Sequence, residues 1–215
     1  MSFNFVAPYY RSLETIVFGN GLQRARTCWI EKITRPKRTL ILGEGNGRFL
    51  CELVRAHPGI DIDCIDASDV MLKIAQARLR RISPESVPHV HFSCADISKW
   101  LPQKSYDLLV THFFLDCFPR KELPAIVRKL ANAAQPGAAW LIADFTIPRQ
   151  TFPRICALFL LQLMYTFFRA TAGIAARKLV DPTPYLNDSG FCRTSEKLYG
   201  AGLIRSDLYL LDQPG

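Results

Sequence analysis

The sequence lacks any Cys-x-x-Cys pair, although it contains seven cysteines in 215 residues. The missing ligand spacing excludes a typical structural zinc site, and dispersed thiols in apolar contexts predict buried free cysteines in a reducing compartment. The amino terminus also lacks a charged segment followed by an apolar core, so we expect no secretory signal peptide. Together these absences predict a cytoplasmic protein without a metal site. The cysteines are Cys28, Cys51, Cys64, Cys94, Cys117, Cys156 and Cys192.

Long runs of lysine and arginine are absent as well, although the net charge is +8. The basic residues are scattered along the chain, which favours a solvated basic surface over a nucleic-acid or anionic-membrane partner. The apolar fraction of 49% is ordinary for a globular chain, and the length suits one domain with a full core.

No apolar stretch is long enough for a comfortable membrane span, which needs about 20 residues. The most apolar segment, 155–168, lies between Arg154 and Arg169. Because a helix that is apolar all round must be covered, we expect this segment to pack on a sheet and to form one wall of an apolar substrate pocket. Contact of residues 151–172 with a membrane surface is the alternative use of the same face.

The most informative stretch that is present runs from 39 to 48. Residues 40–42 (Leu-Ile-Leu) are an apolar run typical of a buried parallel strand. Residues 43–47 (Gly-Glu-Gly-Asn-Gly) form a glycine turn, and residues 48–55 have helical spacing. A strand, a glycine turn and a helix are how a Rossmann-like domain begins, and bare backbone in such a turn lets a ligand approach closely.

The spacing of the glycines restricts the class of ligand that this turn could bind. The dinucleotide fingerprint is Gly-x-Gly-x-x-Gly, whereas this turn reads Gly-x-Gly-x-Gly and contains Glu44. A carboxylate at that point would repel a pyrophosphate but suits a ligand with an ammonium group. The next strand, 60–65, ends at Asp66, where an acidic side chain can hold ribose hydroxyls.

These residues resemble the first motif of the class I S-adenosylmethionine-dependent methyltransferases, in which Gly-x-Gly-x-Gly follows an acidic residue or leucine. Asp66, Asp96 and Asp144 each stand at the end of an expected strand, which strengthens the resemblance. The resemblance covers nearly the whole chain and implies S-adenosylmethionine as cofactor. It also implies that Asp96 accepts a hydrogen bond from the exocyclic amine of the adenine. The cofactor-binding residues predicted in this way are Tyr10, Gly43, Glu44, Gly45, Asn46, Gly47, Asp66, Ala67, Met71, Ala95, Asp96, Ile97, Thr111 and His112.

The resemblance implies an α/β fold with a Rossmann-like, doubly wound, seven-stranded sheet that is mostly parallel and ends in an antiparallel hairpin. Besides the first two strands, we expect strands at 90–94, 106–110, 138–143, 191–199 and 203–211. Helices are expected at 20–33, 48–55, 68–79, 119–130 and 185–190, with a loop at 83–88 and a turn at 135–137. One domain is predicted over 1–215, consisting of an N-terminal helical lid segment (1–35), a cofactor-binding core (36–150), an apolar helix and substrate wall (151–190) and a C-terminal hairpin (191–215).

Within this family the pattern is nearest to the ubiquinone and menaquinone biosynthesis methyltransferases. Residues 7–10 (Ala-Pro-Tyr-Tyr) resemble part of their lid, although Arg11 stands where Asp is usual. Residues 144–148 resemble their Glu-Phe-Ser-x-Pro segment. An aromatic anchor that packs on the sheet is the alternative interpretation of residues 1–18.

The reaction implied is direct in-line transfer of a methyl group to a small, apolar or aromatic acceptor. Alignment alone contributes roughly 7–11 kcal/mol to such a step, so the absence of a Ser/His/Asp constellation does not exclude an enzyme. His112 and Asp116 follow the fourth strand, where the strand order reverses, and we predict that one of them orients or deprotonates the acceptor. Structural roles, a turn cap for His112 and a helix start for Asp116, are the alternatives.

Three other functions are alternatives to methylation of a small molecule. A protein that binds S-adenosylmethionine or S-adenosylhomocysteine without catalysis is the main rival, since it would retain the same motif. A nicotinamide dehydrogenase is disfavoured by the glycine spacing and Glu44. Nucleic-acid methylation is disfavoured because Thr-His-Phe-Phe (111–114) replaces the Asn/Asp-Pro-Pro-Tyr motif after the fourth strand. The sequence identifies neither the acceptor nor the oligomeric state.

Overall fold

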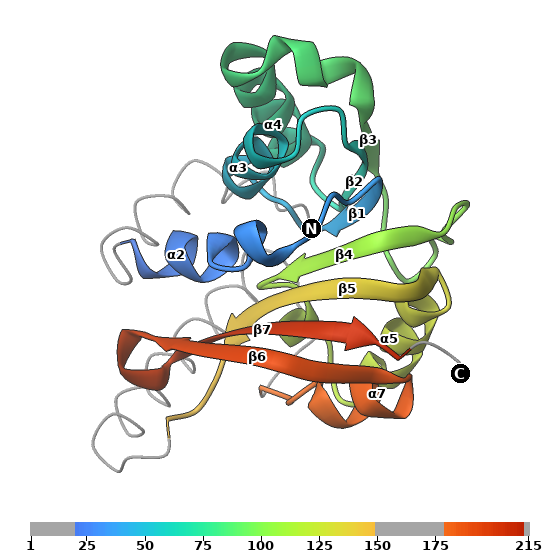
Figure 1. Cartoon of the computed structure of the whole chain (residues 1–215). Helices are drawn as coiled ribbons and strands as arrows, with labels where there is room; N and C mark the ends of the chain where they lie inside the picture. The colour runs from blue at the N-terminus through green and yellow to red at the C-terminus, as the bar shows by residue number, and fades with distance from the viewer. Residues whose placement is uncertain (1–19, 149–178, 213–215) are drawn as a thin grey trace.

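The computed structural model describes residues 20–148 and 179–212. These residues form a seven-stranded sheet of order β3-β2-β1-β4-β5-β7-β6 and the helices packed on it (Figure 1). Neighbouring strands from β3 to β5 are parallel, and β7 is antiparallel to both β5 and β6. The predicted α/β fold with a C-terminal antiparallel pair is therefore confirmed. The strands are β1 (Arg38–Leu42), β2 (Asp61–Asp66), β3 (Val90–Cys94), β4 (Tyr106–His112), β5 (Ala134–Phe145), β6 (Phe191–Tyr199) and β7 (Ile204–Leu211).

Helices cover both faces of the sheet. The helices α3 and α4 bury their apolar stripes in one core cluster, whereas α5 and α7 contribute to a second cluster. Ile41 belongs to the first cluster and its neighbours Leu40 and Leu42 belong to the second. Burial on both faces explains why β1 needs a continuous apolar run. The helices are α2 (Gly21–Thr27), α3 (Arg48–Ala56), α4 (Asp69–Ile82), α5 (Leu123–Ala131) and α7 (Thr183–Asp188).

Four expected boundaries are wrong. The helix expected at 20–33 divides into α2 and the 3-10 turn η2 (Ile30–Lys32), and the loop expected at 83–88 is the 3-10 helix η3 (Pro84–His89). The helix expected from residue 119 begins only at Leu123. The turn expected at 135–137 lies inside β5, where pairing with β4 moves from Tyr106↔Ala134 to Leu108↔Ala139. A bulge at Gly137, whose φ is 76°, therefore replaces a chain reversal.

The cysteines only partly follow their predicted burial. All six within the described ranges are free. Cys51 and Cys64 are buried, whereas Cys94 and Cys192 are exposed. The exposed pair lies on β3 and β6, the two edge strands of the sheet, where one face of the strand meets solvent.

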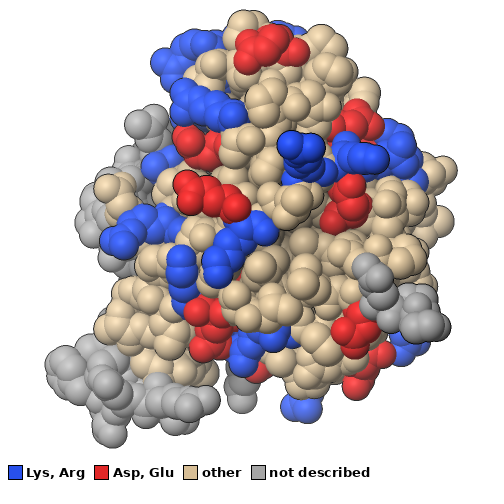
Figure 2. All heavy atoms as spheres, viewed as in Figure 1, with Lys and Arg blue, Asp and Glu red and all other residues tan. Residues whose placement is uncertain are grey.

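Charged side chains of both signs are interleaved on the face shown in Figure 2. Lysine and arginine form no continuous stripe on this face, in line with the expected solvated surface. Within the two described ranges, no helix is long and apolar enough to cross a membrane, and no group of three or more His, Cys, Asp or Glu could hold a metal ion. The predictions for Tyr10, for residues 1–18 and for residues 151–172 fall outside those ranges.

Candidate functional site

The strand order reverses between β1 and β4, and ligands of open α/β sheets bind beyond the carboxyl ends of the strands at such a point. The glycine loop occupies that position, after β1. Gly43, Gly45 and Gly47 all have positive φ values, of 68°, 68° and 80°. A Cβ on Gly43 would meet Phe114 at 2.7 Å and one on Gly47 would meet the Ala75 Cα at 2.8 Å, whereas one on Gly45 would meet no atom of the described residues within 4 Å. Gly43 and Gly47 are therefore needed for close packing, and the Gly45 backbone is left uncovered by the described part of the chain.

Glu44 turns inward and caps α3. One carboxylate oxygen, Oε1, accepts hydrogen bonds from the backbone N–H groups of Phe49 and Leu50, each at 3.1 Å. These are donors that a phosphate would use at a helix N-terminus. Two N-terminal donors of α3 are therefore engaged within the chain. Burial raises the pKa of Glu44 to about 7, against the lowering effects of the two hydrogen bonds and of Arg26.

The raised pKa predicts how stability responds to pH at Glu44. Between about pH 4.5 and pH 7 the folded chain holds a proton that the unfolded chain releases, so the contribution of Glu44 to the free energy of unfolding falls as pH rises. Glu44→Gln keeps the acceptor oxygen but cannot ionise. We expect the free energy of unfolding of the variant, relative to the natural chain, to increase from about pH 5 to about pH 8 in urea titrations. A difference that is the same at both pH values would contradict the raised pKa.

Asp66 links the glycine loop to the start of α4. Its Oδ2 accepts from the Gly45 N–H at 3.1 Å, and its Oδ1 accepts from the Ser68 N–H at 2.9 Å. Burial raises its pKa, although the backbone hydrogen bonds act in the opposite direction. Each oxygen retains a lone pair beyond the bond it makes, so the carboxylate can still accept from a ligand hydroxyl.

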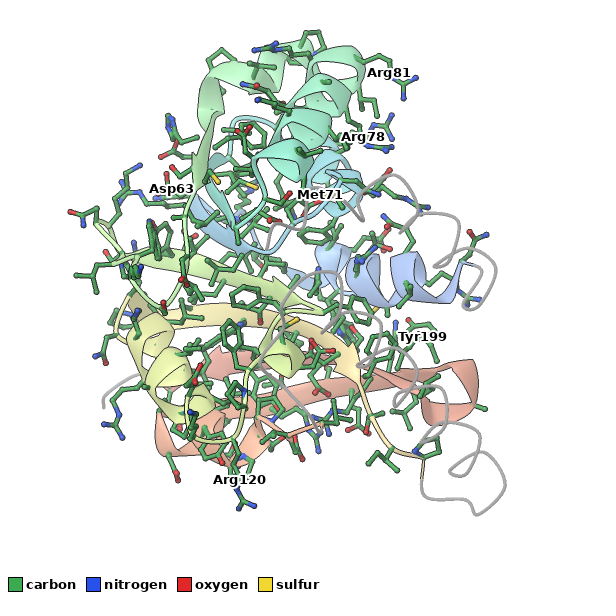
Figure 3. The ribbon with its side chains drawn as sticks, turned by 180° about the vertical axis from the view of Figure 1, so that it is seen from behind. Asp63, Met71, Arg78, Arg81, Arg120 and Tyr199 are labelled. Carbon is green, nitrogen blue, oxygen red and sulfur yellow. The ribbon has the colours of Figure 1, made fainter. Side chains whose placement is uncertain are left out.

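The remaining predicted adenosyl contacts surround Asp66. Ala67 is exposed, and Met71 is buried in the first turn of α4, whose cap is the Ser68 hydroxyl. Figure 3 shows Met71 toward the middle of the molecule and Arg81, from the other end of α4, at its outer margin. Arg78 of the same helix donates from Nε to the Asn46 carbonyl at 2.8 Å and so fixes the loop.

The loop after β3 completes this side of the site. The Ala95 N–H donates to the Asp66 carbonyl at 3.0 Å, which places residues 95–97 beside the end of β2. The Asp96 carboxylate is exposed, and its hydrogen bond from the Ser98 N–H lowers its pKa. Ile97 is buried. Asp96 is therefore ionised and accessible, as an acceptor for an amine must be.

Thr111 and His112, at the end of β4, are both buried but differ in their partners. The Thr111 hydroxyl accepts from the Trp140 indole N–H at 2.9 Å, so its side chain belongs to the core. The His112 ring packs edge-on against Phe49, with centroids 4.5 Å apart, and neither ring nitrogen has a partner among the described residues. Burial, with a further contribution from Arg26, holds the pKa of His112 well below its usual range, so the imidazole is neutral.

Arg26 is a site residue that sequence reasoning missed. It lies on α2, its guanidinium is 5.0 Å from the centroid of the Phe113 ring, and its charge lowers the pKa values of Glu44 and His112. The spacing of apolar residues in the sequence predicted a helix in this region. It did not indicate which arginine of the helix would face the glycine loop.

Two buried carboxylates lie beyond the glycine loop. Asp116 belongs to the 3-10 turn η4 (Leu115–Cys117), and Asp144 stands near the end of β5. They are 7% and 6% exposed. The acidic position Asp144 was predicted from its strand end but not assigned a role at the site.

The match to known families covers the core of the chain. Residues 40–139 match a family described as "Methyltransferase domain". The methyltransferase pynC of Aspergillus niger is 27% identical over 151 residues, which are 68% of this chain and 41% of that protein. The chain thus spans less than half the length of this curated relative. Residues 40–139 are therefore similar to a methyltransferase domain.

Solved structures share the fold over most of the chain. Mitomycin 7-O-methyltransferase is similar with a TM-score of 0.71 and 17% identity, covering 98% of this chain and 61% of that one. Magnesium protoporphyrin IX methyltransferase from Synechocystis PCC 6803, solved with bound S-adenosylhomocysteine, gives a TM-score of 0.65 and 17% identity over 89% of this chain and 82% of its own. The chain therefore shares the fold of these two solved methyltransferases.

Proposed function

We propose that this chain, whose residues 40–139 match a methyltransferase family, transfers the methyl group of S-adenosylmethionine to a small apolar or aromatic acceptor. The observation that carries the proposal is the open space over Gly45 beside the Asp66 carboxylate, at the reversal of strand order. The occupied cap of α3 accounts for the choice of an adenosyl group without a pyrophosphate.

The residues fit this cofactor by their chemistry. Asp66 would accept from the ribose hydroxyls, Asp96 would accept from the adenine amine, and Met71 and Ile97 would border the adenine with apolar surface. Arg26 would complement the negative end of the methionine moiety. When bound, the cofactor supplies a methyl group that its sulfonium already activates. The chain must then orient the acceptor and exclude water, which aromatic residues after β4 suit.

The predicted acceptor residues differ in what they can do with a proton. His112 is neutral at pH 7 and a weak base, so it suits the orientation of the acceptor by a hydrogen bond. Asp116 has its pKa raised by burial to about 6, which keeps it mainly ionised near neutrality while making it a stronger base than an ordinary carboxylate. We propose Asp116 as the residue that deprotonates the acceptor. Residues 1–18 and 151–172 would form the cover and wall of the acceptor pocket, the latter also being the segment proposed for peripheral membrane contact.

Calorimetry with two ligands tests the cofactor. We expect S-adenosylhomocysteine to bind at micromolar or tighter affinity and NAD to bind more weakly, because the α3 donors are already occupied by Glu44. Tighter binding of NAD would overturn the proposal.

A matched pair of glycine variants locates the cofactor. Gly45→Ala and Gly59→Ala both introduce a Cβ at positive φ, 68° and 79°, with nothing within 4 Å. We expect both to lower stability to a similar extent, but only Gly45→Ala to weaken S-adenosylhomocysteine binding, by about tenfold or more. Equal affinities in calorimetry would show that the ligand does not lie against Gly45.

A further inference from the structure

We infer that Asp116 and Asp144 act as one carboxylate pair that shares a proton and receives the proton of a hydroxyl group, so that the methyl acceptor is a hydroxylated aromatic molecule. The inference rests on the proposed function and adds to it Asp144, the accepting atom and the substrate class.

The geometry brings the two side chains to one place. The Phe113 N–H donates to the Ala143 carbonyl at 2.6 Å, which holds the chain after β4 against the end of β5. Asp144 follows Trp140 and Ile142 at intervals of two, and both of these belong to the cluster on the α5 face. The Cys117 thiol lies 3.6 Å from the Asp116 Oδ1. Burial, and then the charges of Asp116 and Asp144, raise the pKa of this thiol, so both carboxylates lie near it.

Asp144 has an unusual environment for a carboxylate. Both oxygens are fully buried, and neither makes a hydrogen bond of regular geometry in the part of the chain that the structure describes. The Phe114 N–H is the backbone donor near enough to lower the pKa of this carboxyl. A buried carboxylate with so little hydrogen bonding is strongly unfavourable when ionised, so such a group keeps its proton or meets a ligand. Because it ends a strand beside the switch point, a ligand is the use that its position favours.

The surrounding charges leave the pair with one proton near neutrality. Burial, and then the charge of Asp116, raise the pKa of Asp144 well above its usual range. From β7, Asp207 acts in the same direction and Arg205 opposes it. Arg205, however, also donates to Asp181 at 2.8 Å and lies 2.8 Å from Asp207, so much of its charge is compensated.

Burial raises the pKa of Asp116 to about 6, against the lowering effect of the hydrogen bond from the Cys117 thiol, a titratable group that lies on the α5 side among the described residues. The charge of Asp66, from β2, also reaches this thiol. Because the pKa of Asp144 is raised well above its usual range, we assign the shared proton to Asp144 and the negative charge of the pair to Asp116.

The proton transfer balances with the methyl transfer. The acceptor O–H donates to the ionised Asp116 while its oxygen lone pair attacks the methyl carbon. The new C–O bond forms as the C–S bond breaks, and the C–S electron pair stays on sulfur. The proton passes to Asp116, so that the pair briefly holds two protons, and one is then lost to solvent.

A hydroxyl acceptor fits this charge better than an amine. An ammonium group would pair with the negative charge and keep its nitrogen lone pair bound to a proton, which blocks attack. The pKa of a phenol is about 10, like that of tyrosine, whereas the pKa of an alcohol is near that of water, about 15.7. The pKa of a phenol is therefore much nearer to that of Asp116, and a phenol gives up its proton to Asp116 more readily than an alcohol does. One aromatic pair, Phe114 with Phe118, packs in the cluster on the α5 face, and another, Phe113 with Phe145, packs in the cluster that includes α2; the ring centroids are 5.1 Å apart in each pair.

The experiment first tests the protonation of the pair. The whole chain is labelled with ¹³C at aspartate carboxyl carbons, and the signals are followed against pH in the natural protein, Asp116→Asn and Asp144→Asn. We expect Asp144 to be protonated at pH 7 and Asp116 to titrate near pH 6, with the two signals responding to each other. Ordinary, independent titration of both carboxylates overturns the pair.

Two simple probes then test the substrate class, with S-adenosylhomocysteine bound. We expect p-cresol to bind more tightly than benzylamine, and Asp116→Asn and Asp144→Asn each to weaken p-cresol binding by about tenfold, while S-adenosylhomocysteine affinity is unchanged. The matched control is Asp63→Asn, which removes the charge of a partly buried aspartate on β2 and should change neither affinity. Preference for benzylamine, or binding of neither probe, overturns the hydroxyl acceptor. Failure of S-adenosylhomocysteine itself to bind would instead overturn the proposed function.

Discussion

Asp66→Ala is expected to weaken S-adenosylhomocysteine binding by roughly 1.5–3 kcal/mol, the usual value of hydrogen bonds to a charged group. This corresponds to a loss of roughly tenfold to 150-fold in affinity. The substitution removes the acceptor proposed for the ribose hydroxyls. It also releases the Gly45 and Ser68 N–H groups, which hold the glycine loop against the start of α4. Both effects act on the same ligand, so their sum should be large.

Two controls separate the ligand contact from a general loss of stability. Asp69→Ala removes a neighbouring carboxylate that pairs with exposed Lys73 at 2.6 Å, and it should leave the affinity unchanged. Asp66→Asn keeps the shape and one acceptor oxygen, so an intermediate affinity is expected. An Asp66→Ala protein that binds S-adenosylhomocysteine normally in calorimetry would place the ribose elsewhere.

The sequence was sufficient for the features that depend on local pattern. The apolar run 40–42 predicted a strand buried on both faces, and Leu40, Ile41 and Leu42 are at most 1% exposed. Strands β2 to β5 and the terminal pair were also expected close to their observed ranges. Because the carboxyl ends of parallel strands meet at one edge, the position of Asp66 beside the glycine loop also followed from order along the chain.

Contacts between distant segments were beyond this reasoning. Glu44 was predicted to be compatible with an ammonium group, and that stays a prediction; that one oxygen of its carboxylate caps α3 was not foreseen. The only feature of the sequence that pointed to this cap was the position of Glu44, a few residues before the start of the helix. His112 was expected to titrate near neutrality, yet its burial beside Phe49 and the charge of Arg26 lower its pKa. No periodicity in one sequence reports either environment.

Chain reversals were also harder to place than strands. Gln-Pro-Gly at 135–137 is typical of a turn, and its positive φ at Gly137 is indeed turn-like. Pairing of Ala134 with Tyr106 nevertheless keeps this segment in the sheet as a bulge. Local turn chemistry and sheet pairing favour different assignments here, and the long-range hydrogen bonds of the sheet decide the outcome.

Gly47→Ala is expected to cause the largest loss of stability among the loop variants. The φ of +80° costs an alanine about 1–2 kcal/mol. The new Cβ would also lie 2.8 Å from the Ala75 Cα and 3.2 Å from the Ala75 carbonyl oxygen. These are backbone atoms of α4, which cannot rotate away as a side chain can. Overpacking of this kind costs about 1–3 kcal/mol, so the free energy of unfolding should fall by roughly 2–5 kcal/mol.

Gly59→Ala isolates the steric part of this loss. Gly59 has nearly the same φ, +79°, but a Cβ there would meet nothing within 4 Å. Urea unfolding of the two variants should therefore differ by roughly 1–3 kcal/mol, with Gly47→Ala the less stable. Equal free energies of unfolding would mean that α3 and α4 separate easily at Ala75. In that event the close approach of the glycine loop to α4 would not be what holds Gly45 and Asp66 in register at the site.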